Sequence, residues 1–162
     1  MNYEQYTIKA QEALQNAASI AQQNDHSQVG TEHILLALLE QKDGLIPPLV
    51  ERIGVSPSAL IQDTKQALDY YQRISGDVQI SLSSEAAKIL AKADKEAAFL
   101  KDEYLSTEHI LLAIAESDGR SKDLLQKRGI TKKSILEALK SLRGNQRVTS
   151  QDPEATLQSL EK

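Results

Sequence analysis

Glutamate and histidine stand side by side in the same seven-residue word at two places in the chain. The word Thr-Glu-His-Ile-Leu-Leu-Ala contains Glu32 and His33 in its first copy and, 76 positions later, Glu108 and His109 in its second. Two histidines facing each other across an axis between the copies could bind a metal ion or transfer protons. The alternative is that each imidazole caps or packs at the start of a helix. We favour this alternative, because the chain has no cysteine and neither histidine has supporting ligands.

The two glutamates also have two interpretations. Glu32 and Glu108 each fall at the predicted start of a helix, where a carboxylate complements the positive end of the helix dipole. As a pair they could instead bind a ligand or a partner protein. We favour the dipole interpretation and keep both residues as candidates for a substrate or partner contact.

Motifs that bind nucleotides or carry out catalysis do not occur in this sequence. No glycine is followed by lysine, so the chain lacks the Gly-x-x-x-x-Gly-Lys-Ser/Thr phosphate loop. It also lacks a Gly-x-Ser-x-Gly elbow and a His-Glu-x-x-His helix. We therefore expect no catalytic residue, no metal site and no cofactor in this chain.

Helices must position these residues, and an apolar stripe shows that the duplication extends beyond the word. The stripe is formed in the first half by Ala10, Leu14, Ala17 and Ala21, and 76 positions later by Ala86, Leu90, Ala93 and Ala97. Its spacing is that of one buried helix face. An internal repeat of this size predicts two copies of one structural unit. We expect the two units to share a single core around an approximate twofold axis.

Each unit is predicted to contain four helices. In the first unit the signals are Thr7, Thr31, Pro47 or Pro48, and Ser56-Pro57 as helix starts, and Gly54 as the end of the third helix. In the second unit we expect helices near 83–101, 107–117, 121–128 and 132–142. The predicted fold class is all-α, with two pseudo-twofold-related four-helix repeats packed into one eight-helix domain.

The segment between the two units is predicted to be an extended connector. Val78, Ile80 and Leu82 alternate with polar residues, which is the pattern of a strand packed on one face. The predicted organisation is repeat 1 at 1–72, the connector at 73–82, repeat 2 at 83–143 and a linker at 144–162.

The C-terminal stretch differs in composition from the two repeats. The run from Gly144 is polar and aperiodic, as in a linker. Asp152-Pro153 then has the form of a new helix start, and Leu157 and Leu160 give that helix an apolar side with nothing to cover it. We therefore expect the chain to be an N-terminal fragment that stops where another domain begins.

Composition narrows the possible partners. The formal net charge of −4 and the pI of about 5.4 disfavour nucleic acid, which is bound by basic surfaces. Aromatic residues make up only 4% of the chain, so platforms for stacking bases are also not expected. No stretch has the length of a membrane span, and no secretion signal is visible. We expect a cytoplasmic, monomeric domain that contacts neither nucleic acid nor membrane.

The doubled word, placed in the second helix of each unit, resembles the Clp N-terminal domains, which contain two such repeats. Further segments resemble the ClpB family of protein disaggregases within this group. They are Gly-Asp-Val-Gln-Ile-Ser-Leu-Ser-Ser-Glu at 76–85, Asp-Glu-Tyr-Leu-Ser-Thr-Glu-His at 102–109 and Leu-Arg-Gly-Asn-Gln-Arg-Val-Thr-Ser-Gln-Asp-Pro-Glu at 142–154. The last run is similar to the junction into the first nucleotide-binding domain of that family.

The resemblance implies a chaperone function. The domain would contact unfolded or aggregated polypeptides and aid their delivery to a hexameric threading ring during recovery from stress. ATP and Mg²⁺ would bind only in the ATPase domains of the full-length protein, which would cooperate with the DnaK system. The residues that the resemblance links to this work are Thr7, at the surface, and Asp102 and Glu108, and for Thr7 and Asp102 a plain cap and a plain loop acid are equal alternatives.

One surface departs from the family pattern. Some members line a peptide groove with leucines, and the corresponding positions here are Lys92, Glu96 and His109. Helical spacing places Phe99 on the face of Lys92 and Glu96, away from the buried stripe. Phe99 could therefore be an exposed anchor for an unfolded segment, or its ring could fold over the margin of the core.

A second functional assignment also fits the doubled word. The N-terminal domain of ClpC contains the same two words and docks adaptors or recognises phosphoarginine. By that resemblance Glu32 and Glu108 would be paired acceptors for a guanidinium group. A passive spacer without any ligand is the remaining alternative.

Overall fold

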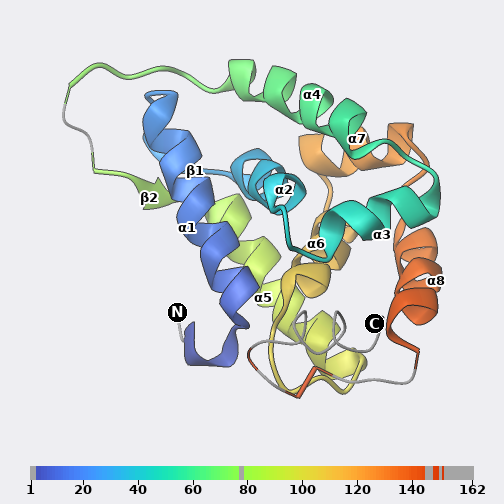
Figure 1. Cartoon of the computed structure of the whole chain (residues 1–162). Coiled ribbons are helices and arrows are strands. Elements are labelled where there is room, and N and C mark those ends of the chain that lie inside the picture. Colours follow the sequence, from blue (N-terminus) through green and yellow to red (C-terminus); the bar gives the residue numbers. More distant parts are fainter. Residues whose placement is uncertain (1–2, 77–78, 145–147, 150, 152–162) are drawn as a thin grey trace.

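The computed structural model describes residues 3–76, 79–144, 148–149 and 151. Within these residues eight α-helices form two sets of four, which confirms the all-α fold class (Figure 1). The first set consists of α1 (Ile8–Gln23), α2 (Thr31–Glu40), α3 (Ile46–Ile53) and α4 (Pro57–Ala67). The second consists of α5 (Ser84–Phe99), α6 (Thr107–Glu116), α7 (Arg120–Lys127) and α8 (Lys132–Arg143). Short 3-10 turns occupy Tyr3–Gln5 and Leu68–Tyr70.

Most of the predicted helix boundaries are confirmed by their capping contacts. The hydroxyl of Thr7 accepts a hydrogen bond from the backbone N–H of Ala10 at 3.1 Å, which caps α1. Ser56 caps α4 with Pro57 in the first helical position. Gly54 ends α3 with a φ of 103°, in the left-handed region that favours glycine.

The predicted cap of α2 is wrong. Thr31 is the first residue of the helix, and the N-cap is Gly30, which has no side chain to offer. The side chain of His33 makes a different capping contact, in which its Nδ1 accepts the backbone N–H of the N-cap residue Gly30 at 2.9 Å. In α6 the N-cap is Ser106, and its N–H donates to His109 Nδ1 at 2.8 Å. The expectation that both histidines cap helices is therefore confirmed.

Matching contacts interleave the two sets of helices. Val29 in strand β1 (Gln28–Val29) pairs with Leu82 in strand β2 (Ser81–Leu82), directly before α5. Tyr6, directly before α1, forms the corresponding bridge with Leu105. Tyr6 and Leu82 are 76 positions apart, and so are Val29 and Leu105. The two contacts are therefore equivalent: each joins a residue just before the first helix of one repeat to a residue just before the second helix of the other. The helices exchange in the same way, because α3 packs on α8 and α4 on α7.

The core lies around the two helices that contain the repeated word. Figure 1 shows α2 and α6 in the middle of the molecule. Eight of the ten residues of α2 and nine of the ten of α6 are buried. A helix that is covered on all sides can only lie inside a domain. Because the apolar residues of both repeats form one continuous cluster around these helices, the repeats share a single core.

Two segments outside the helices contact the core. Ser81–Leu82 forms a parallel two-stranded sheet with Gln28–Val29, and Ile80 packs against the core; Val78 lies outside the described residues. Val148, in the predicted linker, is buried. Asp152-Pro153, Leu157 and Leu160 also lie outside the described residues.

Candidate functional site

The second copy of the word builds a cluster of buried charges, which we call the charged cluster: Asp102, Glu108, His109, Arg143 and the backbone N–H of Val148. The Nε2 of His109 donates to Asp102 at 2.7 Å, because its Nδ1 is already the acceptor at the helix cap. Asp102 also accepts from Arg143 at 2.6 Å and from the Val148 N–H at 2.8 Å. The side chains of Asp102 and His109 have no exposed surface.

Hydrogen bonds keep Asp102 ionised inside the protein. Burial by itself would raise the pKa of Asp102, but the bonds from His109, Arg143 and Val148 outweigh it and hold that pKa at about 2. Arg143 is the counter-charge, and it also lies 3.6 Å from Glu108. Arg143, at the end of α8, thus connects the loop before α6 to α6 itself.

The first copy of the word builds a different cluster from the same histidine. The Nε2 of His33 lies 2.8 Å from Nδ1 of His26, and Tyr71 stacks on the His26 ring with centroids 5.2 Å apart. We call His26, His33 and Tyr71 the aromatic cluster. Burial, with a smaller contribution from His26, lowers the pKa of His33 to about 4. His33 is therefore neutral near pH 7.

Glu32 is held by residues of its own chain. The Tyr71 hydroxyl donates to Glu32 at 2.5 Å, and Arg120 lies 3.4 Å away on the other side. Burial together with the bond to Glu32 raises the pKa of the Tyr71 phenol. Glu32 and Glu108 therefore each already face a guanidinium group, Arg120 and Arg143 respectively.

The surroundings of the two histidines do not fit the bridging metal site that was the first interpretation of the repeated word. Both ring nitrogens of His33 and of His109 have partners within the chain. A ring with both nitrogens occupied has no lone pair for a metal ion. Within the described ranges, no three side chains of the ligating types are grouped to hold a metal ion.

An exposed aromatic ring lies at the end of α5. Phe99 is 70% exposed, so of the two interpretations that helical spacing left open, the exposed ring is the one the structure shows. The expectation for Glu96, on the same predicted face, is wrong, because Glu96 is only 5% exposed. Its carboxylate lies 3.3 Å from Lys132, which also contacts Glu116 at 3.1 Å and the Phe99 ring at 5.4 Å. Burial and the neighbouring Glu116 raise the pKa of Glu96.

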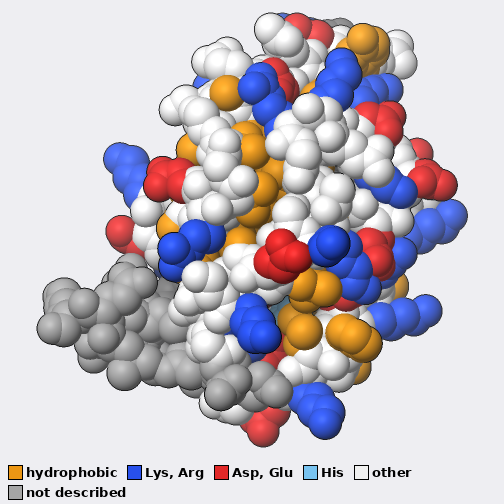
Figure 2. Space-filling view, turned by 90° about the vertical axis from the view of Figure 1, so that its right-hand side faces the viewer, with side chains coloured by type: hydrophobic (Ala, Val, Ile, Leu, Met, Phe, Trp, Pro, Cys, Tyr) orange, Lys and Arg blue, Asp and Glu red, His pale blue; other side chains and the backbone are white. Residues whose placement is uncertain are grey.

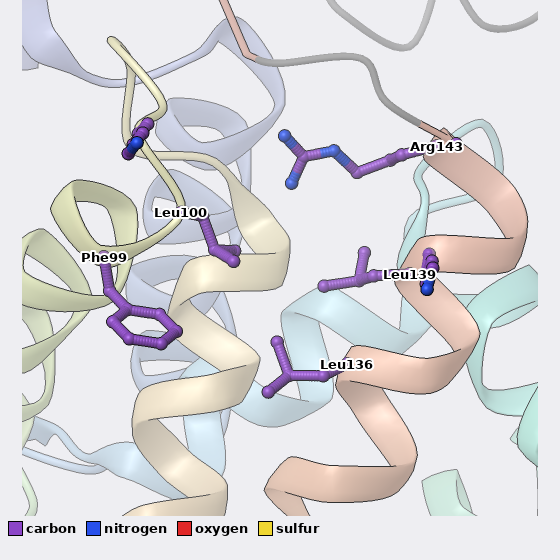
Figure 3. A pocket seen from close by; sticks show the side chains of 8 residues that line it. Phe99, Leu100, Leu136, Leu139 and Arg143 are labelled. Atoms are coloured by element: carbon purple, nitrogen blue, oxygen red, sulfur yellow. The ribbon is translucent and has the colours of Figure 1, made fainter.

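A groove of about 220 Å³ lies between the end of α5 and α8. Figure 3 shows Leu136 and Leu139 extending from α8 toward Phe99 and Leu100. We call this the α5–α8 groove, and its lining also includes Lys101, Lys140, Arg143 and Gly144. Figure 2 shows the side of the molecule that includes α8, where hydrophobic side chains are exposed between Lys and Arg side chains.

With this geometry in place, comparison with known families is decisive. The model of the Clp repeat (R) N-terminal domain matches residues 5–128, which is more than half of the chain. The chain belongs to this family. The Clp N domain described here is of the ClpB type, because it is 40% identical to the chaperone protein ClpB of Bacillus cereus over its whole length. It spans 19% of the length of that relative.

Solved structures agree with this assignment. The N-terminal domain of Hsp104 from Candida albicans has a TM-score of 0.79 and 28% identity, covering 92% of this chain and 98% of that one. A complex of the ClpV N-domain with a VipB peptide has the same fold, with a TM-score of 0.69 and 20% identity over 90% of this chain and 91% of that one. Within the described part of this Clp N domain, no helix has both the length and the apolar character to cross a membrane.

Of the five residues predicted to contact substrate or partners, only Phe99 exposes its side chain. Thr7 and Asp102 have fully buried side chains, and Glu32 and Glu108 are 5% and 2% exposed. The expectation that Thr7 lies on the surface is wrong, because the segment that contains it pairs with the loop before α6 through the contacts of Tyr6 and Thr7 with Leu105.

Sequence reasoning missed two features of this region. It did not pair Asp102 with Arg143, and it did not place Leu136 and Leu139 of α8 beside Phe99. The 76-residue offset contains a signal for the surroundings of Asp102, since it aligns Asp102 with His26, a residue of different charge at the equivalent position of the first repeat.

Proposed function

We propose that this Clp N domain engages unfolded or aggregated polypeptides for a ClpB-type chaperone. The observation that carries the proposal is Phe99, whose ring is 70% exposed at the edge of a groove lined by leucines. An aromatic ring left in water costs free energy that binding recovers, at about 25 cal/mol for each Å² of apolar surface removed from water. An unfolded chain has apolar side chains to bury there.

The comparisons support this proposal in two ways. The relatives with matching sequences are chaperones named ClpB. The ClpV N-domain, which shares the fold, has been solved with a bound peptide. As part of the proposal, the whole chaperone forms a hexameric ring that uses ATP and Mg²⁺, cooperates with the DnaK system during stress recovery and threads the polypeptide that this domain delivers.

The buried residues have a positioning role in this proposal. Asp102 holds Arg143 and Val148, and so fixes the loop after Phe99 against the end of α8. Glu108 adds a second contact to Arg143. Thr7 holds the start of α1 in place as its N-cap. Glu32 holds the start of α2 through its contacts with Tyr71 and Arg120. Phe99 makes the direct contact.

The test is to titrate the chain with a permanently unfolded client and to follow backbone amide shifts. We expect saturable shifts around Phe99, Leu136 and Leu139, and a loss of affinity of about tenfold or more in Phe99→Ala, because one buried aromatic ring is worth about 1.5–3 kcal/mol. Tyr70→Ala is the matched control, since Tyr70 is 75% exposed but lies beside Arg120 and not in the groove. Equal effects of the two variants would refute the proposal.

The ClpC-like alternative has less support. A phosphoarginine or an adaptor guanidinium would need Glu32 and Glu108 as open acceptors, whereas Arg120 and Arg143 already face them. Calorimetry with free phosphoarginine separates the two functions. Tight binding that disappears in both Glu32→Ala and Glu108→Ala would favour the alternative.

A further inference from the structure

The α5–α8 groove has an unbalanced charge. Three basic side chains, Lys101, Lys140 and Arg143, line it together with the apolar ones, and among the described residues no Asp or Glu lines it. The chain as a whole is acidic, with a formal net charge of −4. The local sign is therefore opposite to the sign of the whole molecule.

Two of these charges are available to a ligand. Arg143 is committed to Asp102 and Glu108 and has only 8% of its side chain exposed. Lys101 and Lys140 are both exposed. Among the described residues, no carboxylate forms an ion pair with either of these lysines. An acidic ligand would supply the counter-charges that the described residues do not.

The backbone fixes one of the two lysines beside the groove. Lys101 has a φ of 60°, in the left-handed region, which residues with a side chain rarely adopt. The next residue is the anchored Asp102, so the loop is held on both sides of that turn. In the first repeat the corresponding residue, Asp25, has nearly the same φ of 58° but the opposite charge. The left-handed turn is therefore common to both repeats, whereas the positive charge at this position occurs only in the second repeat, beside the groove.

Lys132 contributes in a different way. Its ammonium lies 5.4 Å from the centre of the Phe99 ring, but it is shared between Glu96 and Glu116. A cation at that distance fixes a ring by its attraction to the π-electrons. Because its charge is already balanced, Lys132 holds Phe99 without adding to the net charge of the groove.

We propose that the α5–α8 groove selects client segments in which an aromatic or aliphatic side chain is flanked by acidic residues. The apolar side chain packs between Phe99, Leu136 and Leu139, and the flanking carboxylates pair with Lys101 and Lys140. This inference rests on the proposed function and names the class of client segment that the domain takes first.

The test uses three unstructured peptides with one Phe-Leu core and flanks of Glu, Gln or Lys. Their dissociation constants are measured by fluorescence anisotropy with the whole 162-residue chain. Non-specific attraction to a domain of charge −4 would favour the Lys peptide. We expect the reverse order, with the Glu peptide binding about three- to tenfold more tightly than the Lys peptide at low salt. This ratio should shrink toward one in high salt, where charges are screened.

Substitutions assign the effect to the two lysines. Lys101→Asp restores the residue type of the first repeat, which tolerates the left-handed turn, and with Lys140→Glu it should invert the preference. Lys42→Gln removes an exposed lysine that is not part of the groove and should leave the preference as it is. Equal loss in Lys42→Gln would overturn the assignment to the groove.

The outcomes separate this inference from the proposed function. If all three peptides bind equally and Phe99→Ala weakens them all, the charge selection is refuted and client binding stands. If no peptide binds and Phe99→Ala changes nothing, client binding itself is refuted. If sedimentation shows dimers that Phe99→Ala disrupts, a second copy occupies the groove and the proposal is overturned.

Discussion

The two copies of Thr-Glu-His-Ile-Leu-Leu-Ala use the same histidine for two different purposes. In both, Nδ1 accepts the backbone N–H of the N-cap residue. In both, Nε2 reaches the residue seven positions earlier, which is His26 in the first copy and Asp102 in the second. One cluster is neutral and aromatic, and the other contains full charges.

The difference shows how duplicated units diverge without a change of fold. A neutral acceptor such as His26 needs only a ring packed beside it, and Tyr71 supplies that ring. A buried carboxylate such as Asp102 needs a counter-charge and further donors, because an unpaired ion inside a protein is very costly. Arg143 and the backbone of Val148 supply them. The charged copy thus draws α8 and the following segment toward the loop after Phe99, and the α5–α8 groove lies there.

The largest expected difference between the copies is in stability. Asp102→Asn leaves Arg143 buried without its main counter-charge and should lower the free energy of unfolding by about 3–5 kcal/mol. His26→Asn, at the equivalent position, loses one neutral hydrogen bond and should cost about 1–2 kcal/mol. Urea denaturation of both variants measures the two values. Equal losses would mean that the charged cluster does not depend on its ion pair.

The two clusters should also fail at different pH. His33 has a pKa of about 4 in the folded chain against 6.5 when unfolded, so the unfolded chain takes up the proton first as the pH falls. Its contribution is complete above pH 6.5 and is lost toward pH 4, by about 3 kcal/mol in total. Asp102, with a folded pKa of about 2 against 3.8, keeps its contribution above pH 4 and loses it toward pH 2.

A matched variant isolates the histidine contribution. Gln in place of His33 can still accept the N-cap N–H but does not titrate. The urea midpoint of His33→Gln should therefore fall less than that of the parent chain between pH 6.5 and 4. The same slope in both chains would contradict the assignment.

The N-cap residues give a third comparison. A Cβ on Gly30 would lie 1.8 Å from the Tyr71 hydroxyl oxygen, so Gly30→Ala must displace the ring and should cost about 1–3 kcal/mol. Ser106, the N-cap of α6, has a buried hydroxyl with no hydrogen-bond partner among the described residues, so Ser106→Ala should change stability by less than about 0.5 kcal/mol. Thermal unfolding of both variants tests this, and a Gly30→Ala, Tyr71→Ala double variant should lose less stability than the sum of the two single losses, because the alanine at position 30 no longer meets the ring.

The smallest expected difference concerns the caps of α1 and α5. Thr7 accepts the Ala10 N–H in a buried position, whereas Ser83 accepts the Ala86 N–H in a partly exposed one. Thr7→Ala should lower the free energy of unfolding by about 1–2 kcal/mol and Ser83→Ala by about 0.5–1 kcal/mol. The second loss is smaller because water can reach the partly exposed Ala86 N–H once the Ser83 hydroxyl is removed, but not the buried Ala10 N–H. Thr7→Ser keeps the hydroxyl and should restore both stability and client binding. If Thr7→Ser binds clients no better than Thr7→Ala, the methyl group itself takes part.

Local patterns predicted the parts of the fold that depend on local physics. The left-handed Gly54 and the Ser56 cap were correct because each depends on residues within one helical turn. The apolar stripe of α1 was correct at Ala10, Ala17 and Ala21, whereas Leu14 is only partly buried. Thr31 was wrong as a cap because the preceding Gly30 takes the N-cap conformation, and His33 reaches back to its N–H. A side chain that caps from inside the helix gives no signal in the usual pattern of cap residues.

For the candidate site the sequence located Phe99 but not its surroundings. The helical period was enough to place Phe99 away from the buried stripe, and its ring is exposed. The same period placed Glu96 on that face, yet Lys132 of α8 and Glu116 of α6 cover it. Periodicity within one helix cannot indicate which other helix approaches it.

The sequence by itself determined the duplication and the eight helices, since both follow from spacing along the chain. It placed Phe99 away from the buried stripe but did not decide whether the ring is exposed. Only the tertiary structure decided which acids lie inside and which cations remain available. Asp102 and Arg143 are 41 positions apart, so their pairing exists only once α8 has packed beside the loop before α6. Burial turns such a pair from a minor surface contact into an obligatory one, because water can no longer stabilise either charge. Lys101 and Lys140, which have no such partner among the described residues, keep their charge available in the groove.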